Sequence, residues 1–137
     1  MTTLKSILLV DDNEIDTFFH RSVLEKMGVV EHIAEAYDGQ QALDYLHEAA
    51  QGGQMPELIF LDINMPIMDG WEFLDSFKQA GYDGQSVVVM MLTTSLNPDD
   101  AERAGELHEL SGFITKPLNE EHMQKILFEH FPDLAKP

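Results

Sequence analysis

The chain has 137 residues, 44% of them hydrophobic, which fits one compact domain with a substantial core. Twenty-five acidic residues against 8 basic ones give a formal net charge of −17. This charge argues against direct binding of nucleic acid or an anionic membrane, because phosphate groups are held mainly by Lys and Arg. Cysteine is absent, which excludes disulfides and thiolate metal sites, and no apolar stretch approaches the roughly 20 residues of a membrane span. We therefore expect one soluble, cytoplasmic domain over residues 1–137.

Short apolar runs alternate with helix-like segments along the chain. Five runs have the apolar or β-branched content of strands: residues 7–10, 29–36, 58–61, 87–92 and 112–115. The run 87–92 is uninterrupted, so we expect that strand to be buried on both faces. The segment 29–36 alternates only weakly and is interpreted as an edge strand.

Each predicted strand is followed by a residue that can cap a helix. The five caps are Asn13, Asp38, Asp69, Asn97 and Asn119. The helix after Asn97 offers the least apolar area, so it is expected to be weakly anchored.

The first predicted helix has apolar residues at helical spacing, which is typical of an amphipathic helix. They are Ile15, Phe18, Phe19, Val23 and Met27, and Gly28 is a stop signal. The six histidines are scattered along the chain and are interpreted as surface residues.

Strands that alternate with helices predict an α/β fold with a doubly wound parallel sheet. Ligands of such sheets bind beyond the carboxyl ends of the strands. The polar residues expected at those ends are Asp11, Asp12, Asp62, Thr93 and Lys116.

These residue types are suited to phosphoryl transfer. Three carboxylates form a hard oxygen ligand set for Mg²⁺. A carboxylate such as Asp62 can attack phosphorus, while Lys116 supplies a positive charge and Thr93 a hydroxyl donor for the phosphoryl oxygens.

The sequence resembles the receiver domain of two-component response regulators over essentially its whole length. The resemblance rests on Val10-Asp11-Asp12, Leu61-Asp62-Ile63-Asn64-Met65-Pro66 with Asp69-Gly70, Leu92-Thr93, and Phe113-Ile114-Thr115-Lys116-Pro117. It implies a flavodoxin-like fold of five strands in the order 2-1-3-4-5, flanked by five helices; a chemotaxis member of this family is one of the standard examples of that order.

The resemblance also implies a chemistry. Asp62 would accept a phosphoryl group from the phosphohistidine of a sensor histidine kinase. Mg²⁺ would be bound by Asp12, Asp62 and the backbone carbonyl of Asn64, with Asp11 acting mainly through water.

Further residues would recognise the phosphoryl group and pass on the signal. Thr93 and Lys116 would bind the phosphoryl oxygens, and Thr93 and Phe113 would form the switch. The bond between Lys116 and Pro117 would be cis, and the signal would leave through the surface of residues 97–110, 112–115 and 119–131. Thr94 departs from the family, which often has Ala or Gly there.

Few residues follow the last predicted helix, so a stand-alone regulator without an attached output domain is expected. It would not be an enzyme beyond its own phosphorylation and dephosphorylation, and would be a monomer or weak homodimer. It would act on a downstream protein partner or a phosphotransfer protein.

The alternatives are an intermediate phosphocarrier in a multi-step phosphorelay and an aspartate-nucleophile phosphatase. The phosphatase would require an Asp-x-Asp motif after its first strand, where this chain has Asp11 next to Asp12. A flavodoxin-like mononucleotide binder would share the fold, but acids occupy the place of its phosphate loop. A degenerate receiver would lack the acceptor or the lysine, and both are present.

Overall fold

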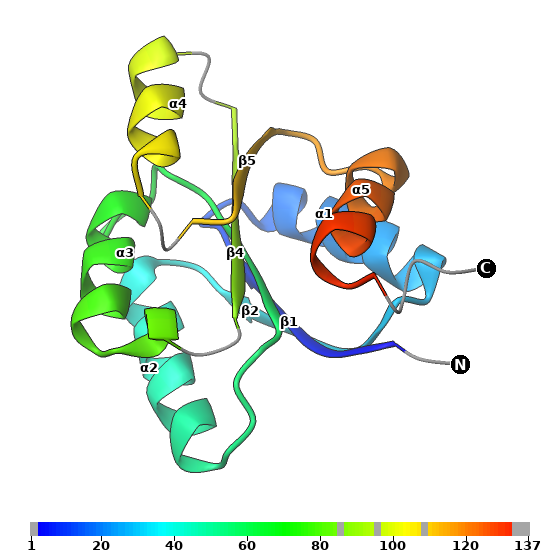
Figure 1. Ribbon diagram of the computed structural model, residues 1–137, viewed down its shortest axis with the longest axis horizontal. Coiled ribbons are helices and arrows are strands. Elements are labelled where there is room, and N and C mark those ends of the chain that lie inside the picture. The colour runs from blue at the N-terminus through cyan, green and yellow to red at the C-terminus, as the bar shows by residue number, and fades with distance from the viewer. Residues whose placement is uncertain (1–2, 85–86, 95–96, 108–109, 133–137) are drawn as a thin grey trace.

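The computed structural model of the protein describes residues 3–84, 87–94, 97–107 and 110–132. Strands and helices alternate along them: β1 (Leu4–Val10), α1 (Glu14–Met27), β2 (Val30–Ala36), α2 (Gly39–Gln51), β3 (Leu58–Leu61), α3 (Gly70–Gln79), the 3₁₀ helix η1 (Tyr82–Gly84), β4 (Val88–Thr93), α4 (Pro98–Gly105), β5 (Gly112–Thr115) and α5 (Glu120–His130). The strands form one parallel sheet in the order β2-β1-β3-β4-β5 (Figure 1). The predicted class and strand order are confirmed, with β2 at an edge.

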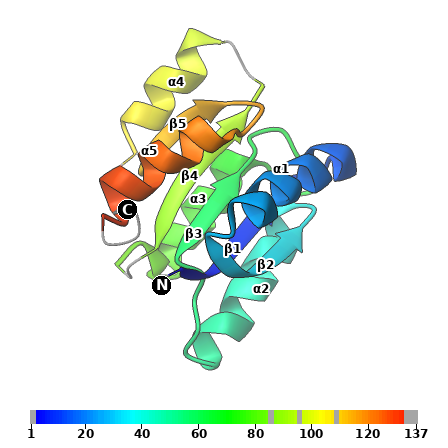
Figure 2. The same ribbon diagram turned by 90° about the vertical axis from the view of Figure 1, so that its right-hand side faces the viewer.

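Helices cover both faces of the sheet. Helices α1 and α5 lie on one face, and α2 and α3 lie on the other (Figures 1 and 2). Each face has its own hydrophobic cluster, and all four residues of β3 are buried between them. Five of the six residues of β4 are buried as well, as its uninterrupted apolar run predicts. None of the helices described is long and apolar enough to cross a membrane.

The predicted caps begin the helices. The Asn13 side chain accepts hydrogen bonds from the backbone N–H groups of Ile15 and Asp16, which fixes the first turn of α1. Asp69 and Glu72 form a reciprocal capping box at the start of α3. Helix α1 ends at Gly28, whose φ of 66° is in the left-handed region.

The face of α1 that packs on the sheet is not the one that its aromatic residues suggest. Ile15 and Phe18 are 80% and 72% exposed, whereas Thr17, His20 and Leu24 are buried. Burial of this face is possible because the Thr17 hydroxyl donates to the carbonyl of Asn13, one turn earlier. The periodicity located the helix correctly but indicated the wrong face.

Helix α4 is the least anchored helix, as expected. Only Ala104 of its eight residues is buried. The guanidinium of Arg103 lies 4.4 Å from the centroid of the Trp71 ring of α3, and this cation–π contact joins the two helices. A half-exposed contact of this kind is weak, so α4 can move at a small energetic cost.

The close approach of α3 to the end of β3 depends on Gly70. Its N–H donates to the carbonyl of Ile63 at 2.7 Å, and a Cβ at this position would lie 2.5 Å from the carbonyl oxygen of Asp62. Any side chain here would push the α3 N-terminus away from Asp62.

We therefore expect Gly70→Ala to lower the free energy of unfolding by about 1–3 kcal/mol, measured by urea denaturation. Gly105→Ala in α4 is the matched control, because nothing lies within 4 Å of its added methyl group. The control should be neutral or stabilising by up to about 1 kcal/mol. Equal effects of the two substitutions would show that α3 does not need this close contact.

Candidate functional site

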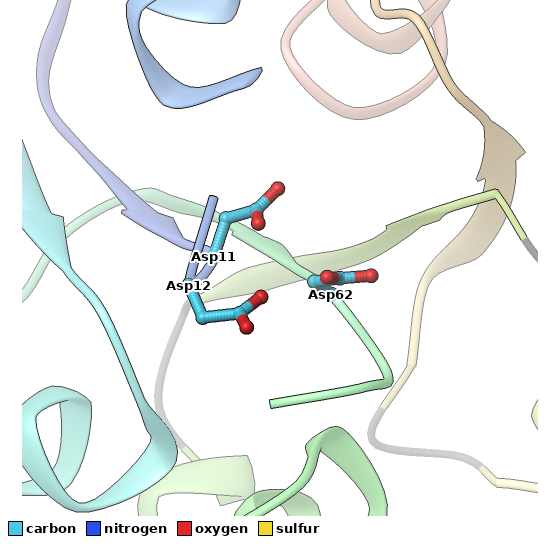
Figure 3. A group of neighbouring side chains, drawn as sticks. All are labelled: Asp11, Asp12 and Asp62. Carbon is cyan, nitrogen blue, oxygen red and sulfur yellow. The ribbon is translucent and has the colours of Figure 1, made fainter. Parts of the chain in front are cut away.

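The register of β1 and β3 places two acidic residues side by side at the carboxyl edge of the sheet. Val10 pairs with Leu61, and the next residues along the two strands are Asp11 and Asp62. The Asp62 N–H donates to the carbonyl of Val10 at 2.9 Å, which continues the ladder to the site. Figure 3 shows Asp11, Asp12 and Asp62 next to one another at the ends of these strands.

The three carboxylates form one acidic cluster. One oxygen from each of Asp11, Asp12 and Asp62 lies within 4.8 Å of the others. Asp11 and Asp62 are buried, whereas Asp12 is exposed. Each buried carboxylate accepts one backbone hydrogen bond of 2.9 Å, Asp11 from Asn13 and Asp62 from Ile63.

Lys116 brings a positive charge into this cluster from the end of β5. Its Nζ lies 2.7 Å from Oδ2 of Asp11 and 3.5 Å from Oδ2 of Asp62. The third carboxylate around Nζ is that of Asp16, whose Oδ2 is 2.9 Å away. The Lys116 N–H donates to the carbonyl of Thr93, and the peptide bond between Lys116 and Pro117 is cis.

Burial shapes the protonation of the site. It raises the pKa of Asp62 from its ordinary value of 3.8 to about 6, and the negative charge of Asp11 adds to the rise. Lys116 and the Ile63 N–H oppose the rise but do not cancel it. Burial alone would lower the pKa of Lys116, but its hydrogen bonds to Asp11 and Asp16 reverse this, so its pKa lies above the ordinary value and it is charged.

His20 corrects the interpretation of the histidines as surface residues. It is only 3% exposed and lies beneath the acidic cluster, where it shares a small cavity with Asp11, Thr17 and Asp62. Burial lowers the pKa of His20, and the nearby charge of Lys116 lowers it further. The remaining histidines that the structure describes are exposed or partly buried, and His108 lies outside the described residues.

The other predicted site residues lie on β4, on β5 and in the loops that follow β3 and β4, and they differ in burial. Thr93 is fully buried at the end of β4, opposite Thr115 of β5. Asn64, two residues beyond Asp62, is exposed in the loop that follows β3. Phe113 is half-buried in β5, three residues before Lys116. Thr94 is exposed.

Sequence reasoning missed Asp16. It lies in the first turn of α1 and contacts Lys116, a residue 100 positions later. Its spacing from Asp11 matched no motif, so only the fold could bring the two side chains together.

The donor set fits a hard divalent cation. Three carboxylates with oxygens this close repel one another, and one ammonium group does not balance their charge. The exposed position of Asp12 leaves the cluster open to solvent on one side, which suits an ion such as Mg²⁺ that keeps several waters.

Comparison with known proteins defines the class to which this fold and site belong. The model of the response regulator receiver domain family matches residues 7–128. The chain belongs to this family. Receiver domains act as phosphoacceptor signalling proteins, bind Mg²⁺ at an acidic pocket and partner with histidine kinases.

Individual relatives agree with the assignment. The chain is similar to the response regulator Rcp1 of Synechocystis, with 34% identity over 90% of this chain and 84% of that protein. It is also 29% identical to a segment of the osmosensing histidine protein kinase SLN1 of Saccharomyces cerevisiae, a match that covers 93% of this chain and 10% of the kinase.

Solved structures show the same fold. A two-component response regulator from Cytophaga hutchinsonii superposes with a TM-score of 0.88 at 30% identity, over 95% of this chain and 98% of that one. The Mn²⁺-bound form of Rcp1 superposes with a TM-score of 0.69 at 33% identity, over 96% of this chain and 89% of that one. The phosphorylated cyanobacterial phytochrome response regulator RcpA superposes with a TM-score of 0.73 at 30% identity, over 97% of this chain and 90% of that one.

Proposed function

We propose that the protein is a response regulator that accepts a phosphoryl group on Asp62 from the phosphohistidine of a sensor histidine kinase. The observation that supports this most strongly is the position of the Asp62 carboxylate, which lies within 3.5 Å of Lys116 Nζ and has an oxygen within 4.8 Å of oxygens of Asp11 and Asp12. Phosphorylation of the related RcpA and the similarity to a segment of a histidine kinase support the same chemistry.

Asp62 is the nucleophile of the proposed step. A carboxylate oxygen forms a bond to phosphorus, the bond between phosphorus and the donor imidazole nitrogen breaks, and that nitrogen keeps the electron pair. Lys116 would balance charge on the phosphoryl oxygens, and the Thr93 hydroxyl would donate to one of them. The ionised form of Asp62 is required, and a pKa of about 6 still leaves it mostly ionised at neutral pH.

We propose that Asp12, Asp62 and the backbone carbonyl of Asn64 hold Mg²⁺, with Asp11 acting mainly through water. The ion would offset the repulsion between the carboxylates and the incoming phosphoryl group. The existence of a Mn²⁺-bound form of the related Rcp1 supports the binding of a divalent cation. The ion would also compete with Lys116 for Asp11, because Nζ already lies 2.7 Å from that carboxylate.

Incubation with acetyl phosphate and Mg²⁺ should add one phosphoryl group to the wild-type protein, detected by intact-protein mass spectrometry. Asp62→Asn and removal of Mg²⁺ by a chelator should each abolish the adduct. The control Asp44→Asn, an exposed acid on α2, should be phosphorylated like the wild type. An undiminished adduct in Asp62→Asn, or one on a histidine, would refute the assignment of the acceptor.

The proposed partner organisation follows from the relatives. We propose that the receiver domain acts as a stand-alone regulator, and the match over 84% of the response regulator Rcp1 is the support for this. The phosphodonor would be a separate histidine kinase, and the output would pass to a downstream protein or phosphotransfer protein.

We further propose that the signal leaves through α4, β5 and α5. Helix α4 begins five residues after Thr93 and buries only Ala104, so movement of Thr93 toward a phosphoryl group can shift it. Phe113 is only partly buried against the hydrophobic cluster on the α3 face of the sheet, so its ring is not locked in one position by its surroundings. The predicted output surface includes residues 108–109, which lie outside the described part of the chain.

Hydrogen exchange with and without a phosphoryl mimic and Mg²⁺ should show changed protection in α4 and β5. The reason is that α4 has little buried area to resist a shift, whereas β1 and β3 are held on both faces. An Asp62→Asn protein treated in the same way is the control. Changes confined to the loop after β3, or to residues 51–56, would contradict this output surface.

A further inference from the structure

Lys116 has a carboxylate partner that belongs to neither the acceptor nor the metal-binding acids. Asp16 Oδ2 lies 2.9 Å from Lys116 Nζ, closer than the Asp62 Oδ2 at 3.5 Å. In the structure described here the lysine is therefore held by Asp11 and Asp16 more closely than by the proposed phosphoacceptor.

The position of Asp16 is fixed by its helix. Its backbone N–H donates to the Asn13 side chain at 3.0 Å, so the residue is part of the capped first turn of α1. A carboxylate in the first turn of a helix is also favoured by the helix dipole. The residue that contacts Lys116 therefore lies on a capped helix and not in a loop.

The two closest partners of Lys116 differ in how easily they can be released. The Asp11 side chain is 7% exposed and accepts a second hydrogen bond from the Asn13 N–H. The Asp16 side chain is 35% exposed, so water can replace the lysine at this carboxylate. A partly exposed ion pair is weak, and the Asp16 contact is the one that Lys116 can give up at the smaller cost.

We propose that Asp16 is a positioning residue that holds Lys116 in the resting protein and slows phosphoryl acceptance by Asp62. This inference rests on the function proposed above. When the Asp62 oxygen forms its bond to phosphorus and the donor bond breaks, negative charge gathers on the phosphoryl oxygens, and Lys116 must turn toward them. An ammonium N–H that donates to Asp16 cannot at the same time donate to a phosphoryl oxygen.

The test is the rate at which the adduct forms with acetyl phosphate and saturating Mg²⁺, followed by intact mass. In that reaction the phosphorus–oxygen bond of acetyl phosphate breaks and acetate leaves with the electron pair. Asp16→Asn keeps the shape of the side chain but removes its charge, and should raise the rate about two- to fivefold, the range expected for a partly exposed ion pair. A rate that is unchanged or lower overturns the inference.

Two further variants separate this effect from general electrostatics. Glu14→Gln removes the same charge from the same turn of α1 but has an exposed side chain with no contact to Lys116, and should leave the rate unchanged. In a Lys116→Met background, Asp16→Asn should have no effect, because the residue acts through the lysine. An equal acceleration in Glu14→Gln or in the Lys116→Met background overturns the inference.

Urea unfolding checks that each variant is folded. If Lys116→Met is not folded, the comparison of Asp16→Asn with Glu14→Gln decides alone.

The inference and the proposed function fail differently. If the wild-type protein forms no adduct on Asp62, both are overturned. If the adduct forms at the same rate in wild type and Asp16→Asn, only the inference is overturned.

Discussion

The site is defined by an imbalance of charge at the carboxyl edge of the parallel sheet, where acidic groups outnumber basic ones. Asp11 and Asp62 are buried there beside the exposed Asp12, and Lys116 is the one cation in contact with both buried carboxylates among the described residues. A buried carboxylate without full compensation is costly. The cost is expressed in the raised pKa of Asp62, and a bound cation would offset it.

The elements around the site differ in how firmly they are packed. Strands β1 and β3 carry the acids and are buried between two hydrophobic clusters, while Gly70 allows α3 to approach Asp62 closely. Helix α4, in contrast, is held by Ala104 and by the contact of Arg103 with Trp71. Under the proposed function, a change of charge at the carboxyl edge would shift α4 before it shifts β1 or β3, since the more weakly anchored element yields first.

The sequence allowed the fold and the meeting of Asp11, Asp12 and Asp62 with Lys116 to be predicted, because both depend on local patterns. Apolar runs located the strands, capping residues located the helices, and polar residues after the strands located Asp11, Asp62, Thr93 and Lys116. The failures involve contacts between distant segments. The aromatic residues of α1 suggested a buried face, yet Thr17 and His20 face the sheet, and the contact of Asp16 with Lys116 spans 100 positions.

The most direct test of the charge imbalance is the pH dependence of stability in Asp62→Asn and wild type, measured by urea unfolding with a chelator present. The pKa of Asp62 in the folded protein, about 6, lies above its ordinary value of 3.8, so the stability that protonation contributes is full below about pH 4 and is lost as the pH rises through 6. We expect Asp62→Asn to be more stable than wild type by about 1–3 kcal/mol near neutral pH, with the difference shrinking as the pH falls from about 6 to 4. The surface control Asp44→Asn should show a difference within about 0.5 kcal/mol. A variant that is no more stable than wild type at neutral pH, or a difference that does not change with pH, would contradict a net cost of burying this carboxylate.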